Sequence, residues 1–326
     1  MYRTGATALT RVWITRPLPD VVVDAARAIC DKVVVRQETL PLTDAELRAA
    51  LRDYDIVLPT LGDQFSSAVF ADVPTPRCTL LANFGVGYNH IDVAAAKGAG
   101  IAVTNTPGAV TDATADIGVM LMLMSARRAA EGERMVRAGA WPGWHPTQML
   151  GLHMSGKHVG IVGMGRIGQA IAQRCHFGFG MEVSYFNRSA KDLAFPATRA
   201  PDLLSLASKV DFLVAAVPGG GETRHLIGAD VLAAMQPHAH LVNISRGDVV
   251  DEAALIKALE GRQIGGAGLD VYEHEPLVPS ALSALDTVTL LPHLGTAALE
   301  VRTDMGLMAV DNIRAFCDGA ALPNPV

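Results

Sequence analysis

The sequence predicts an α/β protein that contains two doubly wound parallel sheets. Short apolar runs alternate with helix-like stretches over the first hundred residues, the alternation breaks at NTPG (105–108), and it restarts at His158. Strands separated by helices of this length are typical of βαβ units, in which the strands are parallel. The length of 326 residues fits about two domains at roughly 150 residues each.

In the first half, candidate strands and helices follow one another in order. The strands are expected at 11–14, 33–35, 55–58, 79–82 and 101–103, with helices at 21–30 and 43–51. The second helix has a recognisable start, because Thr43 is followed three residues later by Glu46, the spacing of a capping box.

In the second half, a long apolar helix at 112–127 comes first, and a loop carrying Trp141 and Trp144 follows it. The strands are expected at 159–162, 182–186, 212–215, 241–244, 267–269 and 288–291, with a helix at 166–175 and a last helix at 297–317. The sequence contains no repeat of fixed period and no low-complexity segment.

The composition excludes several classes of protein. Half of the residues are apolar, which is enough for sizeable cores and excludes intrinsic disorder. The 27 Lys and Arg against 33 Asp and Glu leave a net charge of −6, which argues against a general nucleic-acid binder. The longest apolar stretch, Ile117 to Met124, is far shorter than the ~20 residues of a membrane span. We expect neither a nucleic-acid nor a membrane partner.

The termini and cysteines predict a cytoplasmic protein. Residues Met1 to Gly5 contain no hydrophobic signal core, so export is not expected. The four cysteines lack CxxC or CxxH spacing, and we interpret them as reduced, packed thiols with no metal site.

A glycine-rich turn predicts a dinucleotide site. The sequence GMGRIG (163–168) matches GxGxxG, directly follows an apolar strand and opens a helix. Gly163 permits the tight turn, Gly165 lets the backbone approach a pyrophosphate, and Gly168 allows close packing of helix on strand. The alternative is a turn whose glycines serve packing only.

The residues about 20 positions later favour NADP(H) over NAD(H). An NAD site would carry Asp or Glu there to bind the ribose 2′-hydroxyl, whereas this chain has Asn187, Arg188 and Ser189. All three can donate hydrogen bonds to a 2′-phosphate, and Arg188 adds its charge. The alternative is that Arg188 is an exposed loop charge and that NAD(H) is used.

Three segments place polar side chains directly after apolar strands. They are NISRG (243–247), LDVYEHEP (269–276) and LPHLG (291–295). Ligands of open α/β sheets bind at the carboxyl ends of the strands. Together the segments supply a cation, a carboxylate and an imidazole. These groups can hold a 2-keto acid, donate a proton to the developing alkoxide and orient the proton donor.

The sequence resembles the D-isomer-specific 2-hydroxyacid dehydrogenases, particularly the glyoxylate/hydroxypyruvate reductase branch. The resemblance covers GVGYNHID (85–92), the glycine turn, SRG (245–247), EP (275–276) and PHLG (292–295), in family order. It implies that Arg246 binds and polarises the substrate, that His293 is the acid/base and that Glu275 pairs with His293. Glu273 competes with Glu275, which we prefer because it immediately precedes proline as in the family.

The resemblance also implies substrate and cofactor contacts. The loop at 84–88 would hold the substrate carboxylate through Val86 and Gly87, and glycines there leave backbone N–H groups free for an anion. Asp270 matches the residue that contacts the nicotinamide carboxamide. The expected cofactor set is Gly163, Gly165, Arg166, Ile167, Gly168, Asn187, Arg188, Ser189, Val217, Pro218, Thr223, Ile244, Asp270, His293 and Gly295.

One departure from the family lies at 218–223. Related sequences usually carry Pro-Leu-Thr before the Glu-Thr pair, whereas this chain has PGGGET. The resemblance therefore does not decide whether Pro218 and Thr223 contact the cofactor.

Two further features have more than one interpretation. Trp141 or Trp144 would either reach a neighbouring subunit's substrate pocket or pack in a dimer interface. We interpret the stripe of Met120, Met122 and Met124 as core or interface packing.

These expectations combine into one hypothesis. A Rossmann-type cofactor domain (105–296) is inserted in a discontinuous, flavodoxin-like substrate domain (1–104 and 297–326), with the active site in the cleft between them and hinge closure excluding water. The resemblance implies a homodimer through the cofactor domains, and NADPH-dependent reduction of glyoxylate or hydroxypyruvate. The alternatives are an NAD-linked D-2-hydroxyacid or phosphite-type dehydrogenase and a nucleotide-sensing, corepressor-like interaction protein.

Overall fold

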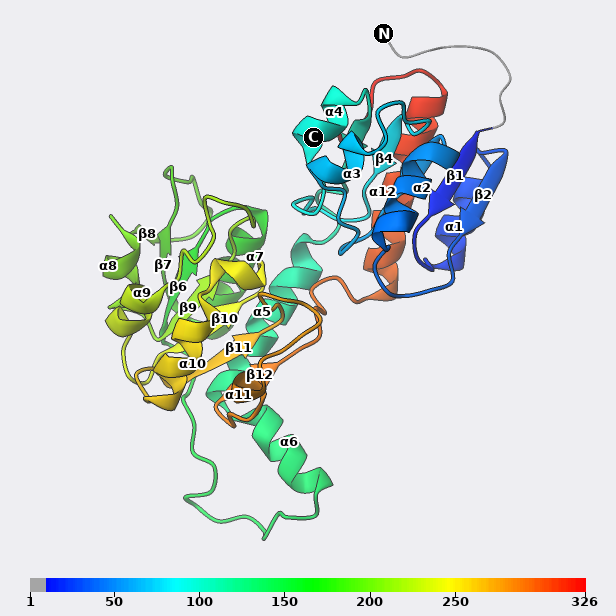
Figure 1. Ribbon diagram of the computed structural model, residues 1–326. Coiled ribbons are helices and arrows are strands. Elements are labelled where there is room, and N and C mark those ends of the chain that lie inside the picture. The colour runs from blue at the N-terminus through cyan, green and yellow to red at the C-terminus, as the bar shows by residue number, and fades with distance from the viewer. Residues whose placement is uncertain (1–9) are drawn as a thin grey trace. The chain divides into compact units, whose positions relative to one another are not determined.

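The computed structural model describes residues 10–326, which form two parallel sheets with helices on their faces (Figure 1). The segment Met1 to Gly5, on which the expectation about export rests, lies outside the described residues. The chain divides into two compact units: unit 1 contains the residues up to Val110 and Ala297–Val326, and unit 2 is Thr111–Thr296. The predicted fold class is confirmed, because the named strands of both units pair only in parallel.

Unit 1 has a five-stranded sheet in the order β2-β1-β3-β4-β5. Its strands are β1 (Arg11–Ile14), β2 (Lys32–Val35), β3 (Ile56–Leu58), β4 (Leu80–Ala82) and β5 (Ala102–Thr104). Its helices are α1 (Asp20–Arg27), α2 (Asp44–Asp53), α3 (Ser67–Ala71), α4 (Val93–Gly98) and α12 (Leu299–Cys317). The capping box of α2 is confirmed: the Thr43 side chain accepts the Glu46 N–H, and the Glu46 carboxylate accepts the Thr43 N–H.

Helix α12 belongs to unit 1 although it ends the chain. It packs against α1 and β4, and its buried face joins the core formed by Val12, Ile14, Val22, Leu80 and neighbouring residues. The helix axes approach closely at Gly306, where a Cβ would collide with the Val22 side chain. The chain end then returns to the sheet, because Pro325 pairs with Thr104.

Unit 2 has a seven-stranded sheet in the order β12-β11-β10-β9-β6-β7-β8. Its strands are β6 (His158–Val162), β7 (Glu182–Phe186), β8 (Thr198–Arg199), β9 (Phe212–Ala215), β10 (His240–Asn243), β11 (Gly266–Leu269) and β12 (Val288–Leu290). Its helices are α5 (Thr111–Ala126), α6 (Ala129–Arg137), α7 (Arg166–Phe179), α8 (Leu203–Ala207), α9 (Ala229–Ala234), α10 (Glu252–Glu260) and α11 (Ser280–Ser283).

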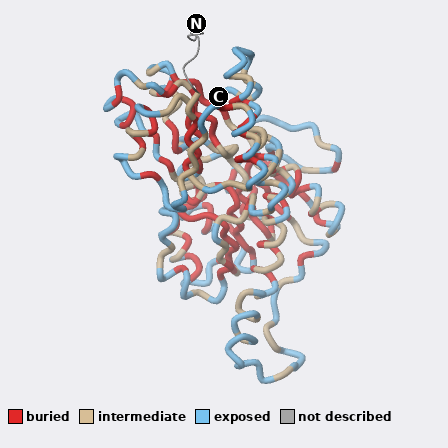
Figure 2. The backbone as a smooth tube through the Cα atoms, turned by 90° about the vertical axis from the view of Figure 1, so that its right-hand side faces the viewer, coloured by how far each residue is buried: buried red, intermediate tan, exposed pale blue. Residues whose placement is uncertain are grey.

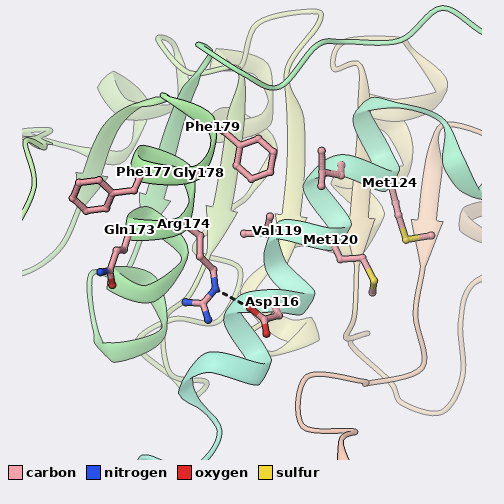
Figure 3. A pocket seen from close by; sticks show the side chains of 10 residues that line it. Asp116, Val119, Met120, Met124, Gln173, Arg174, Phe177, Gly178 and Phe179 are labelled. Atoms are coloured by element: carbon pink, nitrogen blue, oxygen red, sulfur yellow. Dashed lines mark hydrogen bonds and ion pairs between the residues drawn. The ribbon is translucent and has the colours of Figure 1, made fainter.

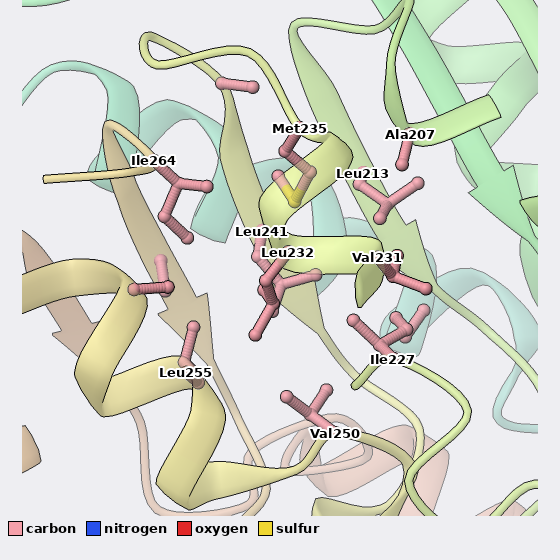
Figure 4. Close-up of a cluster of buried hydrophobic side chains, with 14 of the residues drawn as sticks. Ala207, Leu213, Ile227, Val231, Leu232, Met235, Leu241, Val250, Leu255 and Ile264 are labelled. Atoms are coloured by element: carbon pink, nitrogen blue, oxygen red, sulfur yellow. The ribbon is translucent and has the colours of Figure 1, made fainter. Parts of the chain in front are cut away.

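The sheet of unit 2 separates two apolar cores. Helices α5 and α7 cover one face, with Leu121, Ile161 and Ile171 fully buried between helix and strand. Helices α8, α9 and α10 cover the other face, where Leu232, Leu241 and Leu255 meet (Figure 4). Figure 2 shows the buried residues gathered in the interior and the exposed residues mostly at the periphery of the chain trace. The strands are short apolar runs because both of their faces are covered.

Several elements correct the sequence prediction. The stretch at 129–137 follows α5 as helix α6, where only a loop carrying the tryptophans was expected. It contains no buried residue and its N-cap residue, Arg128, makes no capping hydrogen bond, and its charged side chains form pairs such as Glu133 with Arg137. Most of the other elements that were not predicted are too short to show a period; they are the two-residue strand β8 and helices α3, α4, α8, α9, α10 and α11.

No helix in residues 10–326 is long and apolar enough to cross a membrane.

Candidate active site

The glycine turn joins β6 to α7 at the carboxyl edge of the unit 2 sheet. Gly163 has φ +98°, in the left-handed region, and a Cβ there would lie 2.6 Å from the Ala216 carbonyl oxygen. A Cβ on Gly168 would collide with the Gly163 carbonyl oxygen. Substitution at either position therefore requires the backbone to shift, which is why the turn needs glycine at both.

The middle glycine of the turn has a different environment. Gly165 is the N-cap of α7, and a Cβ added there meets no atom within 4 Å. Arg166 and Ile167 begin the helix beside this open space. Backbone N–H groups at a helix start with free space in front of them fit the diphosphate of a dinucleotide, and the helix dipole favours its negative charge.

The loop after β7 lies next to the glycine turn. The Asn187 side-chain oxygen accepts the Met164 N–H at 3.2 Å, and its amide nitrogen donates to the Ser189 carbonyl. The Arg188 side chain is 91% exposed and forms an ion pair of 3.2 Å with Glu222. The Arg199 guanidinium donates to the carbonyls of Asn187 and Arg188, so a second cation holds this loop.

A histidine and a carboxylate meet at the ends of β11 and β12. His293 Nδ1 lies 2.8 Å from Glu275 Oε2, and Glu275 Oε1 accepts the Tyr272 N–H at 3.1 Å. Burial opposes ionisation of Glu275, but the bond to His293, the Tyr272 N–H and the charge of Arg246 together lower its pKa. Glu273 faces elsewhere, since its carboxylate accepts from Arg224 and His225. The pair that can transfer a proton and stabilise the imidazolium is therefore Glu275 with His293.

The loop that carries His293 is pinned by Asp270. This aspartate is buried, and its two oxygens accept the N–H groups of Leu294 and Gly295 at 2.6 and 2.8 Å. Burial raises the pKa of Asp270, and the two N–H donors oppose that rise. His293 has φ +54°, a strained backbone conformation for a non-glycine residue. Strain of this kind persists only where surrounding contacts determine it, as Asp270 does here.

Arg246 follows β10, and its charge acts on the Glu275 carboxylate. Its Nη1 donates to the Ser245 carbonyl at 2.7 Å, and the Asn243 side chain accepts the Ser245 N–H and donates to the Arg246 carbonyl. Burial lowers the pKa of Arg246, while the charges of Glu275 and Asp248 act in the opposite direction. A cation beside an imidazole–carboxylate pair can bind a keto acid and polarise its carbonyl.

Comparison with known proteins identifies the family. The family model described as D-isomer specific 2-hydroxyacid dehydrogenase, NAD binding domain, matches residues 119–295. A glyoxylate reductase from Thermococcus gammatolerans is 41% identical over 322 residues, which cover 97% of this chain and 95% of that protein. One from Pyrococcus furiosus is 40% identical with the same coverage. The chain belongs to the D-isomer specific 2-hydroxyacid dehydrogenase family.

Solved structures agree with this assignment. A protein from Polaromonas that is described as a putative D-isomer specific 2-hydroxyacid dehydrogenase gives a TM-score of 0.90 at 35% identity, covering 98% of this chain and 100% of that chain. An NADPH-dependent glyoxylate/hydroxypyruvate reductase from Sinorhizobium meliloti, in complex with NADP and malonate, gives 0.87 at 34% identity, covering 98% and 97%. The predicted family is confirmed, and the protein is an NAD(P)-dependent oxidoreductase.

The remaining cofactor candidates of this dehydrogenase surround the glycine turn and Arg246. Val217 lies beside Gly163, whereas the Ile244 side chain is buried against α5, so only its backbone is available to a ligand. The Thr223 hydroxyl donates to the Pro218 carbonyl at 2.6 Å and closes the 218–223 loop on itself. Gly219 of this loop packs against the stem of Arg246.

The carboxylate loop predicted at 84–88 lies in unit 1 of the dehydrogenase. Asn83 donates to the carbonyls of Gly85 and Gly87 at 3.1 Å, and Asn105 donates to that of Val86 at 2.9 Å. Within residues 10–326, the N–H groups of Val86 and Gly87 have no protein acceptor. The carbonyls are held by side chains and the N–H groups are left for another partner, as in an anion nest.

Sequence reasoning missed two residues that hold the site loops. The buried Glu252 carboxylate accepts the Glu273 N–H at 3.0 Å, and the Tyr272 hydroxyl donates to the Leu291 carbonyl at 2.8 Å. Neither contact has a sequence signal, because the partners are 21 and 19 residues apart in the chain. In the described part of the chain, no group of three His, Cys, Asp or Glu side chains could hold a metal ion.

Proposed function

We propose that this dehydrogenase reduces a small 2-keto acid, glyoxylate or hydroxypyruvate, to the 2-hydroxy acid, with NADPH as the preferred cofactor and the cytoplasm as its place of action. The observation that carries the proposal is the pairing of His293 with Glu275 at 2.8 Å beside the charge of Arg246. Curated relatives that align over nearly the whole chain are glyoxylate reductases.

Each of the three side chains has one part in the proposed reaction. The bound reduced nicotinamide supplies the hydride for the carbonyl carbon. Arg246 binds the substrate and polarises its carbonyl, which stabilises negative charge as it develops on oxygen. His293 donates the proton to that oxygen, and Glu275 keeps the imidazole oriented and stabilises its charged form.

The proposed cofactor contacts follow the sequence prediction. The diphosphate binds at the glycine turn in front of α7, where the open space at Gly165 supports the assignment. Asn187, Arg188 and Ser189 supply donors and no carboxylate to a ribose 2′-phosphate, which supports NADPH. The Sinorhizobium meliloti reductase, which is described as NADPH-dependent and was solved with NADP, supports the same preference. Asp270, Gly295 and Thr223 remain proposed contacts to the nicotinamide side.

The N–H groups of Val86 and Gly87 are the proposed ligands of the substrate carboxylate. Two backbone donors without a protein acceptor, on a loop whose carbonyls are tied by Asn83 and Asn105, support this role. A carboxylate gains more from such donors than a neutral ligand, because hydrogen bonds to an ionised acceptor are stronger.

We also propose that the protein is a homodimer formed through unit 2. A groove of about 800 Å³ lies between α5 and α7 and is lined mainly by apolar side chains (Figure 3). Met120 and Met124 of α5 and Phe177 of α7 contribute to it, and Phe177 is 64% exposed. Trp141 and Trp144, which are exposed beyond α6, would add to the surface covered by the second copy. Exposed apolar patches of this kind are typical of protein interfaces.

The oligomeric state tests the second proposal directly. Light scattering of the purified protein should give twice the chain mass of 34.4 kDa. Phe177→Glu, which places a charge in the groove, should shift the protein towards monomer. The matched control is Leu40→Glu, because Leu40 is a similarly exposed apolar residue of unit 1. A monomeric wild type, or equal behaviour of the two variants, would contradict the proposal.

Cofactor oxidation tests the first proposal. The loss of NADPH absorbance should be measured with glyoxylate, hydroxypyruvate and a panel of larger 2-keto acids, each with NADPH and with NADH. We expect turnover with the two small acids and a higher kcat/KM with NADPH. Absence of turnover with every keto acid would overturn the proposed substrate class. A preference for NADH would overturn only the proposed cofactor.

A further inference from the structure

Glu252 is a buried carboxylate that the proposed chemistry does not use. It is the first residue of α10 and is 7% exposed. Burial raises its pKa, and the nearby charges of Glu273 and Glu275 raise it further. A carboxylate in such a place is unfavourable unless hydrogen bonds compensate for the lost hydration. The N–H of Glu273, which donates to Oε1 at 3.0 Å, compensates in part, and the charge of His274 acts in the same direction.

That N–H belongs to the loop that presents Glu275. Glu273 and Tyr272 follow directly after Asp270 and Val271, and the Tyr272 N–H donates to the Glu275 carboxylate. The backbone of residues 272 and 273 therefore determines where the Glu275 side chain ends. The Glu252 carboxylate accepts the N–H of Glu273, and the N–H of Tyr272 donates to the Glu275 carboxylate, which contacts His293.

A second contact brings the same dipeptide against the Arg246 loop. A Cβ on Gly247 would collide with the carbonyl group of Tyr272 and with the Glu273 nitrogen, so the two backbones touch. The segment 246–252 thus begins with the substrate-binding Arg246, touches Tyr272 and Glu273 at Gly247, and ends with Glu252 bound to Glu273. This segment and the 272–275 loop form one packed unit.

We propose that Glu252 is a positioning residue for the reaction: by accepting the Glu273 N–H it holds the 272–275 loop so that Glu275 reaches His293. This inference rests on the proposed function of the Glu275–His293 pair. What matters is the acceptor oxygen of residue 252 and its reach, because the N–H needs an acceptor and the amide of glutamine also offers one. Without an acceptor, the buried N–H is left unsatisfied and the loop shifts to find another partner.

The test compares Glu252→Ala, Glu252→Gln and a control in the same helix. The control is Glu260→Ala, since Glu260 is an exposed glutamate at the other end of α10. In Glu252→Ala we expect kcat with glyoxylate to fall about 10- to 30-fold, because misplacement of about 1 Å is costly to catalysis. Glu252→Gln should stay within about threefold of the wild type, and Glu260→Ala should be unchanged. The dissociation constant for NADPH should change less than about twofold in every variant.

A double-mutant cycle separates positioning from general damage. If Glu252 acts through Glu275, then Glu252→Ala should lower kcat less than about twofold when it is made in the Glu275→Gln background. Equal losses in both backgrounds would overturn the proposal, as would a Glu252→Gln variant as impaired as Glu252→Ala. If Glu252→Ala does not fold, judged from its melting temperature, the kcat of Glu252→Gln relative to the wild type and the pH dependence of that kcat decide the question. A wild type without keto-acid turnover would instead contradict the proposed function.

Discussion

The loops after β10, β11 and β12 differ from the loop after β7 in how their functional side chains are held. His293 and Glu275 bind one another, and each is tied to a neighbouring backbone through Asp270 or Tyr272. Arg188 extends into solvent, and its ion-pair partner Glu222 is 88% exposed. One region is arranged before any ligand arrives, whereas the other has only an exposed ion pair.

This difference follows the task proposed for each region. Groups that act on a reacting atom gain most from being fixed in advance, because no reorganisation is then needed at the moment of reaction. A group that distinguishes one cofactor from another acts through affinity alone, so a solvated side chain is sufficient. Substitutions in the first region should therefore lower the rate strongly, and those in the second should change cofactor affinity moderately.

The largest expected effect is at His293. His293→Ala should lower kcat with glyoxylate by a factor of about 10²–10⁴, the usual contribution of a general acid. NADPH binding, measured by fluorescence titration, should be nearly unchanged. His238→Ala provides the control, because that exposed histidine contacts Asp211 and not the pair. Turnover near the wild-type value in His293→Ala would remove this residue from its role.

A smaller loss is expected at the carboxylate that orients His293. Glu275→Gln should lower kcat by about 10- to 100-fold, because the imidazole remains but its charged form is no longer stabilised. The matched control is Glu273→Gln, two positions away, whose carboxylate binds Arg224 and His225. If the two variants lose equal activity, or the order is reversed, the assignment of Glu275 is wrong.

The pH dependence tests the same carboxylate. The folded-state pKa of Glu275 is lowered, so its charge persists below the ordinary range of glutamate and is lost as the pH falls through that lowered value. Wild type and Glu275→Gln should therefore differ at neutral pH and converge only in strong acid. Stability measured by urea unfolding has the same sign, with the contribution of the charge present at higher pH. Convergence already near pH 6 would contradict the lowered pKa.

The exposed loop should show a moderate and selective effect. Arg188→Ala should weaken NADPH binding by about 10- to 100-fold, which corresponds to roughly 1.5–3 kcal/mol for hydrogen bonds to a charged group. NADH binding should change less than about twofold, because it lacks the 2′-phosphate. Equal losses for the two cofactors would mean that Arg188 does not recognise the phosphate.

The smallest expected effect is at the partner of Arg188. Glu222→Gln should tighten NADPH binding by about two- to fivefold, because Glu222 competes with the phosphate for the guanidinium and exposed ion pairs are weak. The gain should shrink at high salt and disappear in the Arg188→Ala background. A gain that survives there would show that Glu222 repels the phosphate without involving Arg188.

Much of the fold could be predicted from the sequence. Strands β1, β7 and β9 begin and end where the sequence predicts, because strands that are covered on both faces are rich in apolar residues. The glycine turn was equally predictable, since its backbone conformation restricts the residues it accepts. Helix α6 was not, because it is short, has no capping side chain at its start and buries none of its residues.

The site was predictable in composition and less so in arrangement. A cation, a carboxylate and an imidazole after buried strands indicated the chemistry. Spacing alone left two carboxylates, Glu273 and Glu275, on the same loop, and only the resemblance of the Glu275-Pro276 pair to the family favoured Glu275. Their opposite surroundings arise from side chains far away in the chain, such as Arg224 for one and His293 for the other.

By itself, the sequence determined two parallel α/β sheets, the dinucleotide turn and the types of residue available for catalysis. These depend on the hydrophobic period and on the local backbone conformation, and both are determined by residues that are neighbours in the sequence. The family resemblance had indicated Glu275 as the partner of His293, but only the tertiary structure shows the contact of 2.8 Å between them and the bond from the Glu273 N–H to Glu252. Those pairings join residues 18 and 21 positions apart, and they exist only because separate strands end at the same edge of one sheet.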